Sequence, residues 1–346
     1  MAIPKTMRAL KYEKPHEHSI VEMPVPQIKG DEILVKIKAC GVCGTDLHID
    51  KGEFISKFPL VPGHEAIGEV AAIGPDVKQF KVGDRVAADN SELCGKCFFC
   101  RRGEELMCEN FQAHGVTLPG GFAEYCAYQE GKIYRIENLD WVDATLIEPA
   151  SCAAHGVDII NAHMDSEILI FGAGPTGLVL SQMLKLNGGA KVTIAAPEGL
   201  KMNLAKDLDA ADEYIELSRK DSEPQMKTLR ERHPHGFDVV VEATGSARML
   251  EDSINYVRRG GTLVTYAVYD NDAVVSWKPT KIFNDEIKIT GCFSEVHKFP
   301  AAIGYLDSGK VKVHGIVNKT FTLDQWSECL EAIRNKSAIK AAIVFD

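Results

Sequence analysis

Four cysteines fall within fifteen residues of the chain, at spacings that suit one metal ion: Cys94, Cys97, Cys100 and Cys108. Gaps this short let a single loop wrap a tetrahedral ion, and four thiolates favour zinc. An iron–sulfur cluster or unligated buried cysteines are the alternatives. A site closed by four thiolates leaves no position for a substrate, so the spacing predicts a zinc ion that stabilises an irregular lobe.

A second group of polar residues lies nearer the N-terminus. Cys43 belongs to a segment rich in side chains that could do chemistry, and His64 and Glu65 form a polar pair inside an otherwise apolar stretch. Each of the pair has a plain structural explanation, because His64 could be a hydrogen-bonded core histidine and Glu65 a surface acid. Their spacing alone therefore leaves a role in metal binding open.

A glycine-rich turn follows the apolar residues 167–171 and precedes a helical pattern over residues 176–186. In that context the turn predicts a dinucleotide site, because glycines let the backbone approach a pyrophosphate and the helix N-terminus offers it free N–H groups. The residues of the turn that we expect to bind the cofactor are Gly172, Gly174, Pro175, Thr176 and Gly177.

The acidic residue that usually binds the ribose hydroxyls should end the next strand, about 20 residues after the glycines. Ala196 stands in that region instead, with Glu198 and Lys201 shortly after it. Without a carboxylate the 2′-phosphate of NADP meets no like charge, and Lys201 could pair with it. The alternative is that Glu198 replaces the missing acid while Lys201 is solvated. The pattern favours NADP, with NAD also used, and Thr244 is a further expected cofactor-binding residue.

Two kinds of secondary structure must position these residues. The N-terminal part shows short β-type runs broken by glycine and proline, at residues 33–39, 69–73 and 85–88. From about residue 152 strands alternate with helices, which predicts a doubly wound parallel sheet. Its expected strands are residues 168–171, 192–196, 238–242, 262–268 and 287–290, and its expected helices include residues 200–208 and 249–258. The C-terminal tail has a helical pattern at residues 323–335 and a β run at residues 341–345.

The bulk composition is that of a folded, acidic protein. The chain has 346 residues, of which 45% are hydrophobic and 25% charged, and its formal net charge is −10. The length favours two domains. Scattered basic residues argue against nucleic-acid binding, and the sequence has no apolar run long enough to span a bilayer. We therefore expect a cytoplasmic protein without nucleic-acid or membrane partners that works on a small molecule.

The motifs together carry a family resemblance. The run Gly63-His64-Glu65-x2-Gly68-x5-Gly74-x2-Val77 resembles the signature of the zinc-containing medium-chain alcohol dehydrogenases, and the cysteine lobe and the glycine turn follow in the order of that family. The resemblance implies a GroES-like, mostly β catalytic domain, residues 1–151 and 289–346, that holds two zinc ions, one catalytic and one structural. It also implies a Rossmann domain, residues 152–288, that binds NAD or NADP, so the expected fold class is α/β.

By this resemblance Cys43 and His64 are ligands of the catalytic zinc, whose third protein ligand should fall near residue 148. Alcohol dehydrogenases of the family have cysteine there, whereas this chain has Glu148, with Cys152 four residues further on. The replacement resembles the polyol branch of the family, typified by sorbitol dehydrogenase, in which Glu65 can also ligate the metal. Which of the two glutamates binds the zinc directly stays open.

The same resemblance gives roles to the polar residues that follow Cys43. Thr45 and His48 match the family's proton relay, with the threonine in reach of the substrate oxygen and the histidine nearer solvent. Asp46 is the expected partner that orients His64. A substrate hydroxyl polarised by zinc would lose its proton through this relay and a hydride to the nicotinamide.

The zinc ligation and the segments at residues 92–97 and 112–128 resemble the arabinitol dehydrogenases of fungi. The implied reaction is oxidation of a secondary hydroxyl of D-arabinitol or a similar sugar alcohol to the ketose, and its reverse. Sorbitol, xylitol, a butanediol and threonine are alternative substrates, because pocket shape decides among them. A retained fold that acts as a structural or binding protein is the non-enzymatic alternative. Members of the family pair their cofactor domains, so a homodimer or homotetramer is expected.

Overall fold

The computed structural model describes residues 3–187 and 190–346, and the chain divides into two compact units. Unit 1 comprises Met1–Pro149, Val296–Lys310 and His314–Asp346, and unit 2 comprises Ala150–Glu295 and Val311–Val313. A strand of unit 2, Lys288–Gly291, contains the position at which the sequence predicts a return to the first domain. No helix in the described part of the chain is long and apolar enough to cross a membrane.

Unit 2 is built on a parallel sheet whose strands follow the order β12-β11-β10-β13-β14-β15. Short hydrophobic runs such as residues 168–171 are fully buried, as strands covered on both faces require. The strands are β10 (Glu167–Phe171), β11 (Lys191–Pro197), β12 (Glu213–Leu217), β13 (Phe237–Glu242), β14 (Val257–Thr265) and β15 (Lys288–Gly291). Because β10 and β13 are neighbours, the strand order reverses between them, and the carboxyl ends of strands at such a reversal are where sheets of this kind bind ligands.

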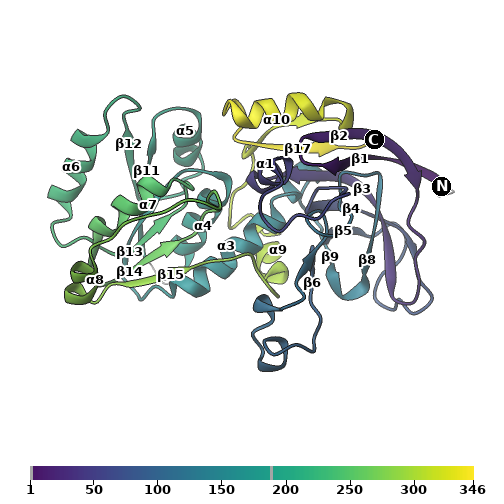
Figure 1. Cartoon of the computed structure of the whole chain (residues 1–346), viewed down its shortest axis with the longest axis horizontal. Helices are drawn as coiled ribbons and strands as arrows, with labels where there is room; N and C mark the ends of the chain where they lie inside the picture. The colour runs from purple at the N-terminus through teal and green to yellow at the C-terminus, as the bar shows by residue number, and fades with distance from the viewer. Residues whose placement is uncertain (1–2, 188–189) are drawn as a thin grey trace. The chain divides into compact units, whose positions relative to one another are not determined.

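Helices pack around this sheet (Figure 1). They are α3 (Ile147–Ile160), which the boundary between the units crosses, α4 (Pro175–Leu186), α5 (Leu200–Asp207), α6 (Glu223–Arg232), α7 (Ala247–Ser253) and α8 (Pro279–Asp285). The core beneath them contains Leu169, Phe171, Phe237, Val240 and Leu263, each at most 1% exposed. This doubly wound α/β unit confirms the predicted fold class.

The predicted helix at residues 249–258 is wrong at its C-terminal end. Helix α7 ends at Ser253, a 3₁₀ turn follows at Ile254–Tyr256, and strand β14 already begins at Val257. Val257 pairs with Phe237 of β13, so sheet pairing overrides the local helical pattern. Strand β14 also ends at Thr265, before the predicted limit of residue 268. Strand β12 and helix α6 were not among the predicted elements.

Unit 1 is built on a seven-stranded sheet among the described residues, in the order β16-β17-β3-β4-β5-β9, with β8 also paired to β3. Its strands are β3 (Glu32–Val42), β4 (Glu65–Ile73), β5 (Arg85–Ala88), β8 (Tyr125–Gln129), β9 (Ile133–Arg135), β16 (Val317–Phe321) and β17 (Lys340–Val344). The hairpin β1 (Thr6–Lys14) and β2 (Glu17–Pro24) forms a separate sheet, and β6 (Ser91–Glu92) pairs with β7 (Gln112–Ala113). The helices are α1 (Gly44–Lys51), α2 (Trp141–Ala144), α9 (Phe299–Asp307) and α10 (Trp326–Arg334).

The C-terminal tail completes the same sheet as the N-terminal strands. Strand β17 pairs antiparallel with β3, and Figure 1 shows the yellow tail beside the purple N-terminal strands. Helix α10 covers the core, where Nε1 of Trp326 donates a hydrogen bond to the hydroxyl of Tyr12 at 2.8 Å. That hydroxyl donates in turn to buried Asp50 at 3.0 Å, which also accepts from Arg334 at 2.6 Å. These buried contacts bind the two ends of the chain into one unit.

Candidate active site

The antiparallel pairing of β3 and β4 brings the predicted metal ligands of unit 1 together. Strand β3 ends at Val42, and Cys43 follows as the N-cap of α1. Strand β4 begins at Glu65, directly after His64. Because Gly41 lies opposite Glu65, the end of one strand is beside the start of the other. The ligand atoms of Cys43, His64 and Glu65 all lie within 4.8 Å of one another.

This cluster contains buried polar atoms that the protein does not satisfy. Nδ1 of His64 has no hydrogen-bond partner among the described residues, and Oε2 of Glu65 has only an ion pair with Nζ of Lys340 at 2.7 Å, although both side chains are buried. Such atoms are costly unless another group pairs with them. A sulfur, a nitrogen and a carboxylate oxygen are the donors that a catalytic zinc site uses. The residues therefore fit a zinc ion.

Glu148 lies in the first turn of α3, within electrostatic reach of the same cluster. Burial raises the pKa of Glu148 to about 7, while the charge of His64 acts to lower it. Burial also acts to lower the pKa of His64, but its contact with Cys43 and the charge of Asp46 raise that pKa well above its usual value. Among the described residues, the group of mutually close ligand atoms includes Glu65 and does not include Glu148.

Asp46, the residue expected to orient His64, lies beside it without a hydrogen bond to it. Its Oδ1 is 3.9 Å from Nδ1 of His64, so the two interact through charge. Its Oδ2 accepts the backbone N–H of Cys43 at 2.8 Å and thereby caps α1. Burial raises the pKa of Asp46 to about 6, against the opposite effect of His64. Asp46 thus fixes the helix that carries the predicted relay.

Helix α1 places the two residues of the predicted relay one turn apart. Oγ1 of Thr45 is 3.6 Å from Sγ of Cys43, so the hydroxyl lies next to the predicted metal ligand. His48 follows three residues later, a spacing that puts side chains on one helix face. Its Nδ1 is 2.6 Å from Oε2 of Glu53. Gly52 ends the helix with φ +78° and turns the chain so that Glu53 folds back onto His48.

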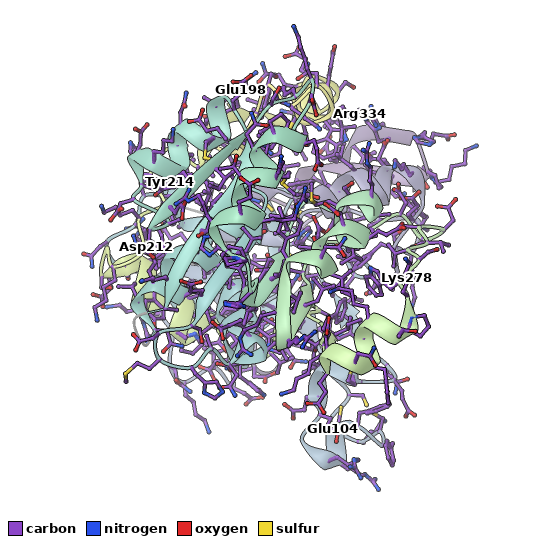
Figure 2. The ribbon with its side chains drawn as sticks, turned by 90° about the vertical axis from the view of Figure 1, so that its left-hand side faces the viewer. Glu104, Glu198, Asp212, Tyr214, Lys278 and Arg334 are labelled. Atoms are coloured by element: carbon purple, nitrogen blue, oxygen red, sulfur yellow. The ribbon has the colours of Figure 1, made fainter. Side chains whose placement is uncertain are left out.

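The four lobe cysteines also converge, with all their sulfurs within 4.8 Å of one another. The backbone N–H groups of Cys94 and Asn110 each donate to Sγ of Cys108 at 3.4 Å. The N–H of Lys96 and the side chain of Asn110 lower the pKa of the Cys94 thiol to about 6. Donors aimed at sulfur favour thiolates, so the cluster fits a four-thiolate zinc ion. Glu104 lies at the projecting end of this lobe in Figure 2.

The glycine turn of unit 2 leaves space where a pyrophosphate would approach. Gly172 has φ +114°, and a Cβ there would lie 3.1 Å from Cγ2 of Thr244. Gly177 similarly faces the carbonyl of Gly172. A Cβ on Gly174, in contrast, would meet no described atom within 4 Å. Gly172 and Gly177 are therefore required by packing, whereas Gly174, the N-cap of α4, leaves room for a ligand before Pro175 and Thr176 begin the helix.

The predicted cofactor residue Thr244 follows strand β13 at the same edge of the sheet. The buried carboxylate of Glu242 accepts the N–H of Thr244 at 2.8 Å, and it also accepts the hydroxyls of Thr244 and Tyr269. These bonds fix the loop beside Gly172. The hydrogen bonds to Glu242 therefore hold Thr244 next to Gly172 of the predicted cofactor-binding turn.

The end of β11 carries no acid at the position that usually binds a ribose. Ala196 is buried there, and exposed Glu198 follows, at one end of the sheet in Figure 2. Gly199 has φ +121° and caps α5, whose first turn contains Lys201. Nη2 of the exposed Arg219 donates to the carbonyl of Glu198 at 3.3 Å. Positive charge therefore gathers near the position where the sequence predicts the 2′-phosphate of NADP.

Comparison with known proteins supports what the geometry indicates. Residues 29–138 match the model of the alcohol dehydrogenase GroES-like domain, and residues 175–308 match that of the zinc-binding dehydrogenases. The chain is 55% identical to D-arabinitol dehydrogenase 1 of Uromyces fabae over 99% of its own length and 98% of that protein. The chain belongs to the zinc-binding dehydrogenase family. Sorbitol dehydrogenase of Bacillus subtilis is 31% identical over 99% of this chain and 98% of its own.

Solved structures agree with this membership. A Sinorhizobium meliloti protein described as a zinc-binding dehydrogenase and bound to NADP superposes with a TM-score of 0.91, at 28% identity, covering 99% of this chain and all of its own. An Escherichia coli alcohol dehydrogenase in complex with NADH gives a TM-score of 0.89 at 26% identity, with the same coverage. The predicted family resemblance and the predicted enzyme class, an oxidoreductase acting on a small molecule, are confirmed.

Three residues of this zinc-binding dehydrogenase lie at the predicted sites without having been predicted. Lys340 places its Nζ 2.7 Å from the carboxylate of Glu65, Glu53 contacts His48, and Arg219 contacts the segment after β11. Burial acts to lower the pKa of Lys340, but the charges of Glu65 and Cys43 raise it, so the lysine is positively charged. Of these three residues, only Glu53 could have been found from its neighbours in the sequence, since it follows Gly52, which ends helix α1.

Proposed function

We propose that the protein oxidises a secondary hydroxyl of a sugar alcohol, with D-arabinitol as the preferred candidate, to the ketose with reduction of NADP, and catalyses the reverse reaction. The observation that carries the proposal is 55% identity to a D-arabinitol dehydrogenase over 99% of the chain. Unit 1 would supply the metal and proton chemistry and unit 2 the dinucleotide site, close to the predicted domains 1–151 with 289–346, and 152–288.

Cys43, His64 and Glu65, with Glu148 nearby, would hold the catalytic zinc, and the four lobe cysteines the structural zinc. Zinc supplies Lewis acidity toward a substrate hydroxyl, and the nicotinamide ring supplies the hydride acceptor. The protein's own side chains would bind the substrate hydroxyl and transfer its proton.

The relay on α1 would carry the proton of the substrate hydroxyl. Oγ1 of Thr45, beside Cys43, accepts a hydrogen bond from that hydroxyl and passes the proton on toward His48. His48 holds it on an imidazole that contacts Glu53. Oxidation of a secondary alcohol releases one hydride and one proton, so this path and the nicotinamide together account for both.

A substrate screen with the purified protein tests the proposal. We expect two zinc ions per chain by elemental analysis and kcat/KM for D-arabinitol at least tenfold above that for sorbitol, xylitol, 2,3-butanediol or threonine. A higher value for one of those compounds would transfer the assignment to it. One zinc ion per chain together with no turnover of any substrate would support the structural or binding alternative.

Cofactor choice is tested separately. We expect kcat/KM for NADP to exceed that for NAD, because Lys201 and Arg219 can pair with the 2′-phosphate and Ala196 presents no like charge. Arg219→Met should reduce kcat/KM for NADP about tenfold and leave that for NAD within twofold. Lys220→Met, a change of the adjacent exposed lysine, is the matched control. If kcat/KM of the unaltered protein for NAD is tenfold or more above that for NADP, the NADP assignment is wrong.

We further propose that the protein forms a homodimer or homotetramer. Strand β15 lies at the edge of the parallel sheet and exposes Ile289, and the neighbouring helix α8 exposes Phe283. An apolar edge strand of this kind is suited to pairing with a second copy. The predicted cytoplasmic location stays a prediction, which fractionation of cells would test.

A further inference from the structure

Glu242, at the carboxyl end of β13, is a buried acid whose hydrogen bonds all come from neutral groups. Its Oε1 accepts the backbone N–H of Thr244 at 2.8 Å and the hydroxyl of the same residue. Its Oε2 accepts the backbone N–H of Gly245 at 3.2 Å and the hydroxyl of Tyr269. Glu242 is 0% exposed, and the described residues form no ion pair with it. Four donors satisfy the two oxygens, but no positive charge compensates the carboxylate.

Two other buried carboxylates of the chain differ from Glu242 because each is paired with a cation. Asp50 contacts Arg334 at 2.6 Å, and Asp89 contacts Lys132 at 3.0 Å, with the two aspartate side chains 3% and 4% exposed. Buried charges are tolerated where an opposite charge compensates them. A positive charge that a ligand brings near Glu242 would therefore be stabilised.

Glu242 also joins two loops at the carboxyl edge of the sheet. Thr244 and Gly245 follow β13, whereas Tyr269 follows β14. Burial raises the pKa of Tyr269, and so do its hydrogen bond to Glu242 and the charge of that residue, so the phenol stays protonated and donates. The first loop lies against the glycine turn, since a Cβ on Gly172 would be 3.1 Å from Cγ2 of Thr244. The positions of both loops thus depend on one carboxylate.

The topology of unit 2 indicates which part of a dinucleotide these loops would meet. A doubly wound sheet has two mononucleotide-binding halves, and the dinucleotide spans them where the strand order reverses. The turn after β10 and the end of β11 belong to the half that binds the pyrophosphate and the adenosine ribose. Strand β13 lies on the other side of the reversal, so we expect the nicotinamide on the side of Glu242. The nicotinamide ring is positively charged when oxidised and neutral when reduced, because it accepts a hydride.

We propose that Glu242 is a positioning residue of the cofactor site whose buried negative charge strengthens binding of the oxidised nicotinamide more than binding of the reduced one. Its hydrogen bonds hold the two loops, and its charge attracts the oxidised ring through space. The inference rests on the proposed function, because it assumes that a nicotinamide dinucleotide binds at the glycine turn.

Cofactor binding by the zinc-loaded protein without substrate tests the inference apart from turnover. The Kd for NADPH is measured by its fluorescence and the Kd for NADP by displacement of NADPH, and both are repeated with NADH and NAD. We expect Glu242→Gln to weaken binding of the oxidised form about tenfold and of the reduced form about twofold, because glutamine keeps an acceptor and lacks the charge. The ratio of the two Kd values is the readout, since a loss of loop structure alone would weaken both forms alike.

Two changes at Tyr269 keep the inference falsifiable if Glu242→Gln does not fold. Tyr269→Lys places a cation beside the carboxylate and should shift the Kd ratio in the same direction as Glu242→Gln. Tyr269→Phe removes one donor and keeps the charge, so it should leave the ratio unchanged. Asp238→Asn is the matched control, because it removes a carboxylate that Arg258 pairs near the amino end of the same strand. It should leave both Kd values unchanged.

The outcomes separate this inference from the proposed function. If Glu242→Gln, or Tyr269→Lys where the first variant does not fold, leaves the Kd ratio unchanged, the inference is wrong while the dehydrogenase stands. The same conclusion follows if Asp238→Asn shifts the ratio to the same extent. If the unaltered protein binds neither form of either dinucleotide, the proposed function itself fails.

Discussion

At the scale of single residues, His48 depends on a partner outside the helix that carries it. Its Nδ1 lies 2.6 Å from the carboxylate of Glu53, which leaves the other ring nitrogen for the relay. Glu53→Gln removes the charge from the group that holds the ring and thereby weakens that hold. We expect kcat/KM for the alcohol to fall about tenfold, with a change in its pH profile, measured by initial rates between pH 6 and 10.

A matched variant distinguishes this role from a general surface effect. Lys51 lies 3.8 Å from the same carboxylate, so Lys51→Met removes a neighbouring charge and leaves the contact between His48 and Glu53 in place. Its pH profile should follow that of the unaltered protein. If Glu53→Gln and Lys51→Met change the rate to the same extent, Glu53 has no special part in the relay.

His114 provides a pH-dependent contribution to stability away from the metal ligands. Burial acts to lower its pKa, but hydrogen bonds to Cys126 and Glu92 raise it to about 10. Because this value exceeds the usual 6.5, the protonated ring stabilises the fold fully below about pH 6.5, and the contribution is lost as the pH rises toward 10. His114→Gln should lower the free energy of unfolding by about 2 kcal/mol at pH 6 and by much less at pH 9.5. Denaturant titrations of both proteins measure this; an equal loss at the two pH values would contradict it.

How far the sequence predicts the site depends on the separation of its residues. The lobe cysteines and the glycine turn were predictable because each group is local, and one loop or one turn positions it. Cys43 and His64 needed the family resemblance, since only the pairing of β3 with β4 brings them together. Lys340 had no signal at all, because its partner is 275 residues away and meets it across Gly41.

At the scale of elements, the cysteine lobe has little besides a metal ion to hold it. Its sulfurs lie within 4.8 Å of one another, and its regular structure is limited to the short pair β6 and β7 and two 3₁₀ turns, Cys100–Arg102 and Glu105–Met107. Cys100→Ser should leave one zinc ion per chain and lower Tm by about 5–10 °C. Elemental analysis and calorimetry measure both quantities.

Cys292→Ser changes a cysteine that lies outside both clusters, so it should keep two zinc ions and nearly the original Tm. If Cys100→Ser also kept two ions, the lobe would not be the structural zinc site.

The predicted helices and strands agree best with the structure where their residues are completely buried. Strand β10 was predicted because its hydrophobic residues are continuous, as in a strand covered on both faces. The end of α7 was not, since residues 254–258 resemble a helix locally and adopt another structure only because Val257 pairs with β13. Strand β12 alternates less clearly and lies at the sheet edge, where partly exposed residues weaken the pattern.

At the scale of the whole molecule, the edge strand β15 of the parallel sheet exposes a hydrophobic side chain to solvent. Ile289 of β15 is 38% exposed and Phe283 of α8 is 81% exposed. If two chains join through this edge, Ile289→Lys combined with Phe283→Asp should yield a monomer of 38.0 kDa, because each change places a charge in an apolar contact. Light scattering after gel filtration measures the mass. Met164→Lys, which alters a residue of unit 2 that is 79% exposed, should keep the original assembly. A double variant that retains that assembly would show that the chains join elsewhere.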